Sequence, residues 1–135
     1  MAAIARKSAL TSQGARSMAK AVLAIGEASD TPLTPRQIAW LSASEKKFAT
    51  TVAGFMRRHG WRVQRNGWIG VGNQHVKGFP DMVCIREAIL FVELKTTTGK
   101  LKPAQEEWRD CILAAGGQWE LWRPRDWEAL KERLK

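Results

Sequence analysis

The sequence predicts an α/β domain in which a mixed central sheet is flanked by helices. Two β-prone runs, residues 81–85 and 89–95, are parted by the polar pair Arg86 and Glu87 and predict a hairpin. Both faces of this hairpin are mostly apolar, so we expect it to be central in the sheet and covered on two sides. Helical patterns precede and follow it.

The segment before the hairpin contains two capping patterns. Thr34 to Gln37 forms a capping box with Pro at the first helical position and predicts a short helix through Leu41. A second box, residues 42–45, predicts the start of a longer helix that ends at Gly60, and residues 61–65 follow as the first strand. Four apolar residues form the inward stripe of the longer helix: Phe48, Val52, Phe55 and Met56.

After the hairpin, Pro103 is placed to begin another helix, on which Gln105 shares the inward stripe with Trp108 and Ile112. A polar residue on this face needs a partner, either a metal cleft or backbone at the rim. Residues 118–122 predict a last strand and residues 124–134 a terminal helix. Three residues of that helix are predicted to point inward: Trp127, Leu130 and Leu134.

Residues 1–33 are predicted to be a basic N-terminal extension or arm, and residues 34–135 the domain itself. Residues 30–35 read as a hinge. The first acid of the chain is Glu27, and Arg6, Lys7, Arg16 and Lys20 precede it. This composition is typical of a basic arm or a loosely ordered helix, and an organellar transit peptide ranks below these two.

Asp81, Glu93 and Lys95 are the residues that carry chemistry. With a three-residue loop at 86–88, Asp81 lies opposite Glu93 and the two Cβ atoms are roughly 5 Å apart. One hard divalent cation can then contact both carboxylates, and the period of two places Lys95 on the same face. The alternative is an ordinary hairpin in which the Asp caps a turn and the strand end is solvated.

The surrounding residues resemble a known family. Gly78-Phe79-Pro80-Asp81, Glu93-Leu94-Lys95, Lys100, Gln105-Glu106-Glu107-Trp108 and Gly116-Gly117 are similar to the VRR-NUC domain, a branch of the PD-(D/E)xK nuclease superfamily. The likeness spans roughly Ser44 to Trp122. It implies a restriction-endonuclease-like core of order αβββαβ, a divalent metal, and endonuclease action, often on branched DNA.

The resemblance also implies roles for individual residues. Asp81 and Glu93 would be metal ligands, Lys95 the catalytic lysine, Glu45 the upstream helical acid and Gln105 the glutamine of the following helix. We expect Mg²⁺ or Mn²⁺ as the cofactor, with the backbone carbonyl of Leu94 as a further ligand. Lys95 would orient or deprotonate the attacking water or stabilise transition-state charge, and Glu45 would bind a second metal or act through water.

Charge agrees with a nucleic-acid partner. The chain has 22 Lys and Arg against 13 Asp and Glu, a formal net charge of +9 at pH 7. No acid occurs from Lys46 to Pro80. We expect cations here and near the site to contact DNA phosphates, although a solvated basic surface is the alternative. The candidate DNA contacts are Lys46, Arg58, Arg62, Arg65, His75, Lys77 and Lys100.

The Gly-rich segment 66–79 is predicted to be a loop or wide hairpin over the substrate. Cys84 and Cys111 each lie in an apolar run and are predicted to be buried core thiols, which favours a reducing, cytoplasmic compartment. No stretch approaches the ~20 apolar residues of a membrane span. The absence of Tyr excludes a tyrosine recombinase, and two His are too few for His-rich metallonuclease motifs.

Three functional hypotheses follow. The first is a metal-dependent, structure-specific DNA endonuclease that prefers branched DNA, since no recognition helix carries an array of base-reading side chains. The second is a Holliday junction resolvase acting as a homodimer, because symmetric cutting of a four-way junction needs two sites. The third is a non-catalytic nucleic-acid-binding module that keeps the fold, and intact Asp81, Glu93 and Lys95 count against it.

Overall fold

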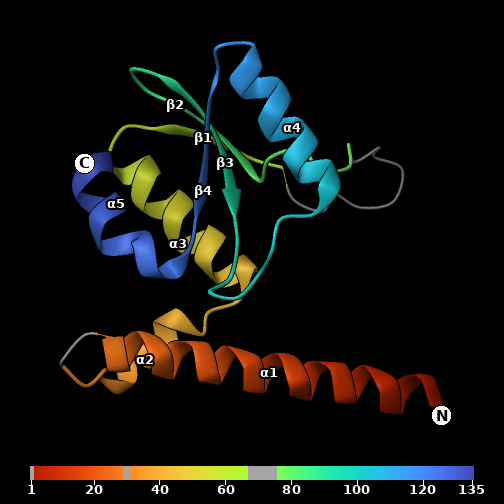
Figure 1. Cartoon of the computed structure of the whole chain (residues 1–135). Coiled ribbons are helices and arrows are strands. Elements are labelled where there is room, and N and C mark those ends of the chain that lie inside the picture. Colours follow the sequence, from red (N-terminus) through yellow and green to blue (C-terminus); the bar gives the residue numbers. More distant parts are fainter. Residues whose placement is uncertain (1, 29–30, 67–75) are drawn as a thin grey trace.

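The structure, a computed structural model, describes the backbone of residues 2–28, 31–66 and 76–135, with side chains described from residue 13 onward (Figure 1). The elements follow in the order α1 (Ala2–Ala28), α2 (Pro35–Leu41), α3 (Glu45–Arg58), β1 (Arg62–Arg65), β2 (Met82–Ile85), β3 (Ile89–Leu94), α4 (Pro103–Ala114), β4 (Gln118–Trp122), a 3-10 turn (Pro124–Asp126) and α5 (Trp127–Leu134). The predicted order αβββαβ is therefore confirmed from α3 to β4.

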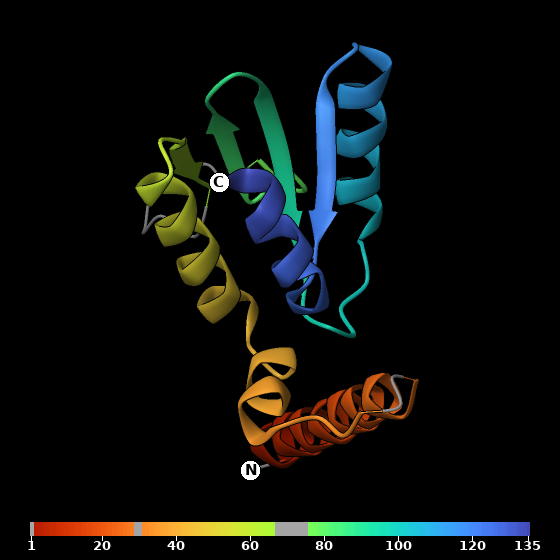
Figure 2. The same ribbon diagram turned by 90° about the vertical axis from the view of Figure 1, so that its left-hand side faces the viewer.

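A four-stranded mixed sheet of order β1-β2-β3-β4 forms the centre of the domain. β1 pairs antiparallel with β2, β2 pairs antiparallel with β3, and β4 runs parallel to β3 after the α4 crossover. Figure 2 shows α3 and α5 on one side of the sheet and α4 on the other. The α/β fold class, with a mixed central sheet flanked by helices, is confirmed.

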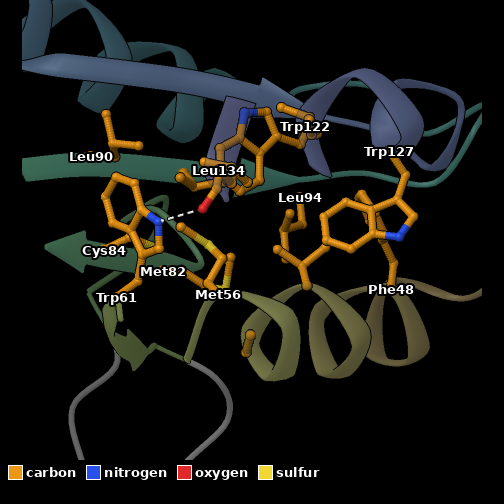
Figure 3. Packing of buried hydrophobic residues seen from close by; sticks show 14 residues of the cluster. Phe48, Met56, Trp61, Met82, Cys84, Leu90, Leu94, Trp122, Trp127 and Leu134 are labelled. Atoms are coloured by element: carbon orange, nitrogen blue, oxygen red, sulfur yellow. Dashed lines mark hydrogen bonds between the residues drawn. The ribbon is translucent and has the colours of Figure 1, made fainter. Parts of the chain in front are cut away.

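The hydrophobic core lies between the sheet and the helices α3 and α5 (Figure 3). Alternation along the hairpin sends Met82, Cys84, Leu90, Val92 and Leu94 into this layer, as predicted, and all five are buried. The inward residues of the flanking helices are buried as well, and they are Phe48, Val52, Met56, Trp127, Leu130 and Leu134, with Phe55 partly buried. The indole N–H of Trp61 donates to the Leu134 carbonyl at 3.0 Å and ties α5 to the start of β1.

The opposite face of the hairpin is covered only in part. At the tip of the hairpin, Ile85 is 43% exposed and its cross-strand partner Ile89 is 53% exposed. Coverage on both sides was predicted for the whole hairpin and is wrong at this end, because α4 packs against β4 and leaves the β2–β3 tip open. The same face is buried at the far end of β3, where Glu93 and Lys95 lie.

The first capping box is confirmed and the second is wrong. The Thr34 hydroxyl accepts from the Gln37 N–H at 3.2 Å, and the Gln37 side chain accepts from the Thr34 N–H at 2.8 Å. For α3, however, the N-cap is Ser44, whose hydroxyl accepts from the Lys47 N–H at 3.1 Å. Ser42 does not have the extended backbone conformation that an N-cap needs, and it is instead the C-cap residue of α2. Glu45 is therefore the first residue of α3.

The cysteines are both free thiols, and only one matches its prediction. Cys84 lies on the core face of β2, where burial raises the pKa of its thiol to about 12. Cys111 was predicted to be buried and is exposed, because it lies on the side of α4 that faces away from the sheet.

Helix α1 runs across the end of the domain below the sheet (Figures 1 and 2), and its N-terminal end extends past the other elements in Figure 1. Its C-terminal half is anchored: Val22 is buried, the Thr98 hydroxyl contacts the Met18 sulfur at 3.9 Å, and Gly26 packs against Leu33. The separation into residues 1–33 and 34–135 stays a prediction. None of the helices in the described ranges has both the length and the apolar character needed to cross a bilayer.

Candidate metal centre

The β2–β3 hairpin brings Asp81 and Glu93 together. Met82 pairs with Val92 and Ile85 with Ile89, and the loop is closed by the Arg86 N–H donating to the Ala88 carbonyl at 3.2 Å. This is the three-residue loop that the sequence predicted, and the register continues to place Asp81 opposite Glu93. The two acids therefore occupy the open end of the hairpin, away from its turn.

Asp81 is fixed on two sides. Its carboxylate accepts from the backbone N–H of Leu94 at 2.8 Å, across the hairpin. The Asn66 N–H donates to the Asp81 carbonyl at 2.7 Å, and the Asn66 side chain donates to the Pro80 carbonyl at 3.0 Å. The role of the Leu94 carbonyl as a metal ligand stays a prediction.

The segment that leads into Asp81 packs closely against α4. Gly78 has φ +84, and a Cβ at this position would lie 2.4 Å from the Ala104 carbonyl carbon and oxygen. Phe79 follows and packs edge-on against Trp108, with ring centroids 4.9 Å apart. This close approach sets the position of Asp81 relative to the beginning of α4.

Glu93 is buried, with 1% exposure, and its partners come from α4 and from the residue that directly follows β3. The Gln105 side-chain amide donates to Glu93 Oε1 at 2.9 Å, so the partner of the inward Gln is the buried carboxylate of the cluster as well as backbone at the start of α4. Gln105 also accepts from the Lys102 N–H at 2.9 Å and thereby caps α4. The Lys95 ammonium lies 3.9 Å from the same Glu93 oxygen, and Lys95 is only 6% exposed.

Glu45, Asp81 and Glu93 form a cluster of three carboxylates. Each offers one oxygen, and these oxygens lie within 4.8 Å of one another; Glu45 is exposed, Asp81 half-buried and Glu93 buried. α3 contributes Glu45 from its first turn because Ser44 caps the helix beside the open end of the hairpin. The structure thus brings together three acids that are far apart in the sequence.

Electrostatics suit this cluster to a cation. Burial and, to a smaller extent, the neighbouring Asp81 carboxylate together raise the pKa of Glu93 to about 8, although Lys95 opposes the increase. Burial also raises the pKa of Glu45, Lys95 lowers it and Asp81 raises it. Three carboxylates with one nearby ammonium leave a deficit of positive charge that an oxygen-binding divalent ion would fill. The donor set therefore fits Mg²⁺ or Mn²⁺.

The predicted DNA contacts divide into two groups. Four lie on segments that meet at the carboxylates: Lys46 on the first turn of α3, Arg65 at the end of β1, Lys77 before Gly78, and Lys100 between β3 and α4. Lys46, Lys77 and Lys100 are exposed, and Arg65 donates to the Thr50 hydroxyl at 3.3 Å.

Arg58 and Arg62 are not brought to the carboxylates. Arg58 ends the 14-residue helix α3, about 20 Å from Glu45 along the axis, and Arg62 pairs with Ile85 near the hairpin turn. His75 lies outside the described residues.

Lys102 is a residue that the sequence reasoning missed. It is exposed at the beginning of α4, and its charge lowers the pKa of Glu45. A metal site was one of the two partners predicted for Gln105, and with Gln105 at such a site the residue three positions earlier would lie close by at the same helix end. That relation was the available signal.

Comparison with known proteins gives a structural match. No family model and no curated protein matches the chain. A solved structure described as a "VRR_NUC domain" superposes with a TM-score of 0.51 at 21% sequence identity, over 65% of this chain and 94% of that chain. The chain therefore has the fold of a VRR_NUC domain, a restriction-endonuclease-like α/β fold, as the sequence predicted.

Proposed function

We propose that this protein is a divalent-metal-dependent DNA endonuclease that hydrolyses phosphodiester bonds. The observation that supports it best is the cluster of Glu45, Asp81 and Glu93 within 4.8 Å, with the Lys95 ammonium 3.9 Å from Glu93. The fold shared with a VRR_NUC domain supports the same reading. A non-catalytic binding module gives no reason to bury Glu93 and Lys95 side by side, because isolated buried charges are costly.

The metal would be held by Glu45, Asp81 and Glu93, with Mg²⁺ or Mn²⁺ matching their oxygen donors. When bound, it supplies activation of a water and neutralisation of charge on the phosphate. The Leu94 N–H holds the Asp81 carboxylate, and Gln105 holds Glu93, so the two ligands keep their orientation without relying on the ion.

Lys95 would act on the substrate directly. Its ammonium lies at the edge of the carboxylate cluster, close enough to orient an attacking water and to stabilise the negative charge that grows on the phosphate. Gln105 would keep the Glu93 carboxylate turned toward Lys95 and the ion. Together these residues would position an in-line attack on phosphorus.

Exposed cations around the cluster would hold the DNA backbone. Lys46, Lys77, Lys100 and Lys102 are exposed on segments that meet at the carboxylates, and they supply phosphate contacts that carry no base information. We therefore propose that the enzyme selects DNA by shape and prefers branched DNA to linear duplex. We assign residues 34–135 to the nuclease unit, and the two free thiols favour a reducing compartment.

The test is cleavage by the full chain of labelled linear, nicked, flap and four-way DNA, with Mg²⁺, Mn²⁺, Ca²⁺ or EDTA. We expect cleavage with Mg²⁺ or Mn²⁺ that EDTA stops and that Asp81→Asn abolishes. Asp110→Asn is the matched control, because Asp110 is an exposed acid paired with Arg109 on α4. If the protein cleaves none of these substrates with any of these metals, the proposal is rejected.

The same assay separates the structure-specific nuclease from a resolvase. Paired nicks placed symmetrically on a four-way junction, together with the mass of a homodimer in light scattering, would identify the resolvase. A monomer that cuts only flap DNA would reject the resolvase and keep the structure-specific nuclease. A sequence-specific cut in linear duplex would reject selection by shape.

A further inference from the structure

The turn between β3 and α4, residues 96–99, immediately follows Lys95 and is held in place by Arg123. Arg123 comes directly after β4, and its Nη1 atom donates to the Thr96 carbonyl at 2.7 Å and to the Gly99 carbonyl at 2.6 Å. The turn is closed from within by the Gly99 N–H, which donates to the Thr96 hydroxyl at 2.9 Å. One guanidinium therefore joins both ends of the turn.

Arg123 is itself fixed at the end of the sheet. Its N–H donates to the Asp126 carboxylate at 2.9 Å, which sets the start of the 3-10 turn. One residue earlier, the Trp122 carbonyl accepts from the Lys95 N–H at 3.0 Å, so the β3–β4 pairing continues up to Lys95. Trp122, which accepts from the Lys95 N–H, and Arg123, whose guanidinium holds the following turn, are thus consecutive residues at the end of one strand.

The turn packs on the Lys95 side chain. A methyl group at Gly99 would lie 3.3 Å from Lys95 Cδ and 3.0 Å from the Thr96 hydroxyl oxygen, so the Gly99 backbone rests against the lysine stem. Lys95 is only 6% exposed, and its ammonium is directed to Glu93 at 3.9 Å. A loose turn would free this stem, since a lysine side chain has several rotatable bonds and high rotamer entropy.

We propose that Arg123 is a positioning residue for Lys95. It fixes the turn at residues 96–99, and the turn holds the lysine stem so that the ammonium stays at the carboxylate cluster. The inference deepens the proposed nuclease function and rests on it. Arg123 itself has no described contact with Glu45, Asp81 or Glu93, so its effect on catalysis passes through Lys95.

The activity test uses the full chain, Mg²⁺ and the DNA that the wild-type protein cleaves best. We expect Arg123→Gln to lower kcat by about 10- to 100-fold, the loss that a small misplacement of a catalytic group produces. DNA affinity measured in Ca²⁺ should change no more than in Arg125→Gln, which removes the same charge from an exposed neighbour. Arg123→Lys should recover part of the loss, because an ammonium donates to the carbonyls without the rigid guanidinium plane.

A double-mutant cycle decides whether the effect passes through Lys95. If it does, Lys95→Ala with Arg123→Gln should be no slower than Lys95→Ala alone. A double variant whose loss of kcat equals the product of the two single losses would overturn the inference. An unchanged kcat in Arg123→Gln would also overturn it. Weaker DNA affinity with kcat retained would overturn it as well and would identify Arg123 as a phosphate contact. Should Arg123→Gln fail to fold, Gly99→Ala takes its place, because its methyl group presses on the lysine stem and should lower kcat while DNA affinity is kept.

A readout without DNA separates this inference from the proposed function. Amine-reactive labelling followed by mass spectrometry should show Lys95 protected in the wild-type protein and labelled at least several-fold faster in Arg123→Gln, with Arg125→Gln unchanged. Equal labelling in all three proteins would overturn the positioning role. A wild-type protein that cleaves no DNA would instead reject the nuclease function, and a fully active Lys95→Ala would reject the catalytic role of Lys95. In either case the labelling result still tests whether the turn positions the lysine.

Discussion

Glu93→Gln is expected to stabilise the metal-free protein at alkaline pH while removing its metal site. Glu93 is buried beside Asp81, and burial raises its pKa from 4.5 to about 8. A raised pKa means that the folded state favours the protonated acid. The stability from this preference is fully present below pH 4.5 and is lost as the pH rises through 8. Glutamine cannot ionise, and so the variant avoids that loss.

The magnitude follows from the distances. A carboxylate oxygen of Asp81 lies within 4.8 Å of Glu93, so the two charges repel by at least about 3.5 kcal/mol at an effective dielectric constant near 20, and the Lys95 ammonium at 3.9 Å attracts Glu93 by about 4 kcal/mol. The attraction to Lys95 therefore offsets the repulsion by Asp81 at most in part, Glu45 adds further repulsion, and burial of the carboxylate is the largest cause of the raised pKa. A pKa change from 4.5 to about 8 sets a ceiling of about 5 kcal/mol. Relaxation and water entry reduce it, and we expect about 1–3 kcal/mol.

The assay is urea or thermal unfolding in EDTA between about pH 5 and pH 9. The wild-type protein should lose about 1–3 kcal/mol more than Glu93→Gln across this range, or about 3–12 °C in Tm. Mg²⁺ at pH 8 should stabilise the wild-type protein and leave the variant unchanged. Glu107→Gln, an exposed glutamate on α4, is the control. Parallel pH profiles, or a variant less stable at every pH, would refute the reasoning.

The remaining predictions concern the site and its support. Lys95→Ala should reduce cleavage by at least ~100-fold with DNA affinity in Ca²⁺ retained, as measured by single-turnover kinetics and fluorescence anisotropy. Ca²⁺ itself should support DNA binding with little turnover because it is larger and more loosely coordinated than Mg²⁺, and equal cleavage rates in both metals would contradict this. Gly78→Ala should cost more than ~2 kcal/mol in urea unfolding, because its Cβ would meet the Ala104 carbonyl at 2.4 Å and φ is +84; unchanged stability would contradict the packing.

The sequence predicted the parts of the fold that local patterns determine. Alternating apolar residues and a three-residue loop set the hairpin register, and that register alone places Asp81 opposite Glu93. The inward position of Gln105 followed from helical spacing, and of its two predicted partners, a metal site or backbone at the rim, the structure shows a contact with each: the Glu93 carboxylate and the Lys102 N–H. The order αβββαβ came from the resemblance and from the same sequence of strand and helix patterns.

Contacts between distant segments could not be predicted in this way. Thr98 meets α1 at Met18, and Arg123 meets the turn after β3, because tertiary packing brings segments together that no local period relates. The predicted start of α3 was wrong because Ser42 and Ser44 are both good N-cap residues, and only the position at which α2 ends decides between them. The exposed Cys111 was missed because an apolar run does not say which side of α4 faces the sheet.

The arrangement of buried charge argues for a working site rather than a structural ion pair. Lys95 and Glu93 lie 3.9 Å apart, beyond hydrogen-bond distance, although both are almost fully buried. A pair selected for stability would close this distance and would not add the Asp81 and Glu45 carboxylates beside it. Gln105 and the Leu94 N–H meanwhile hold Glu93 and Asp81 in fixed orientations, at the cost of keeping like charges close. Such a cluster destabilises the fold without a cation and is compensated by one. The Glu93→Gln experiment measures this difference as the free energy of unfolding in EDTA and in Mg²⁺.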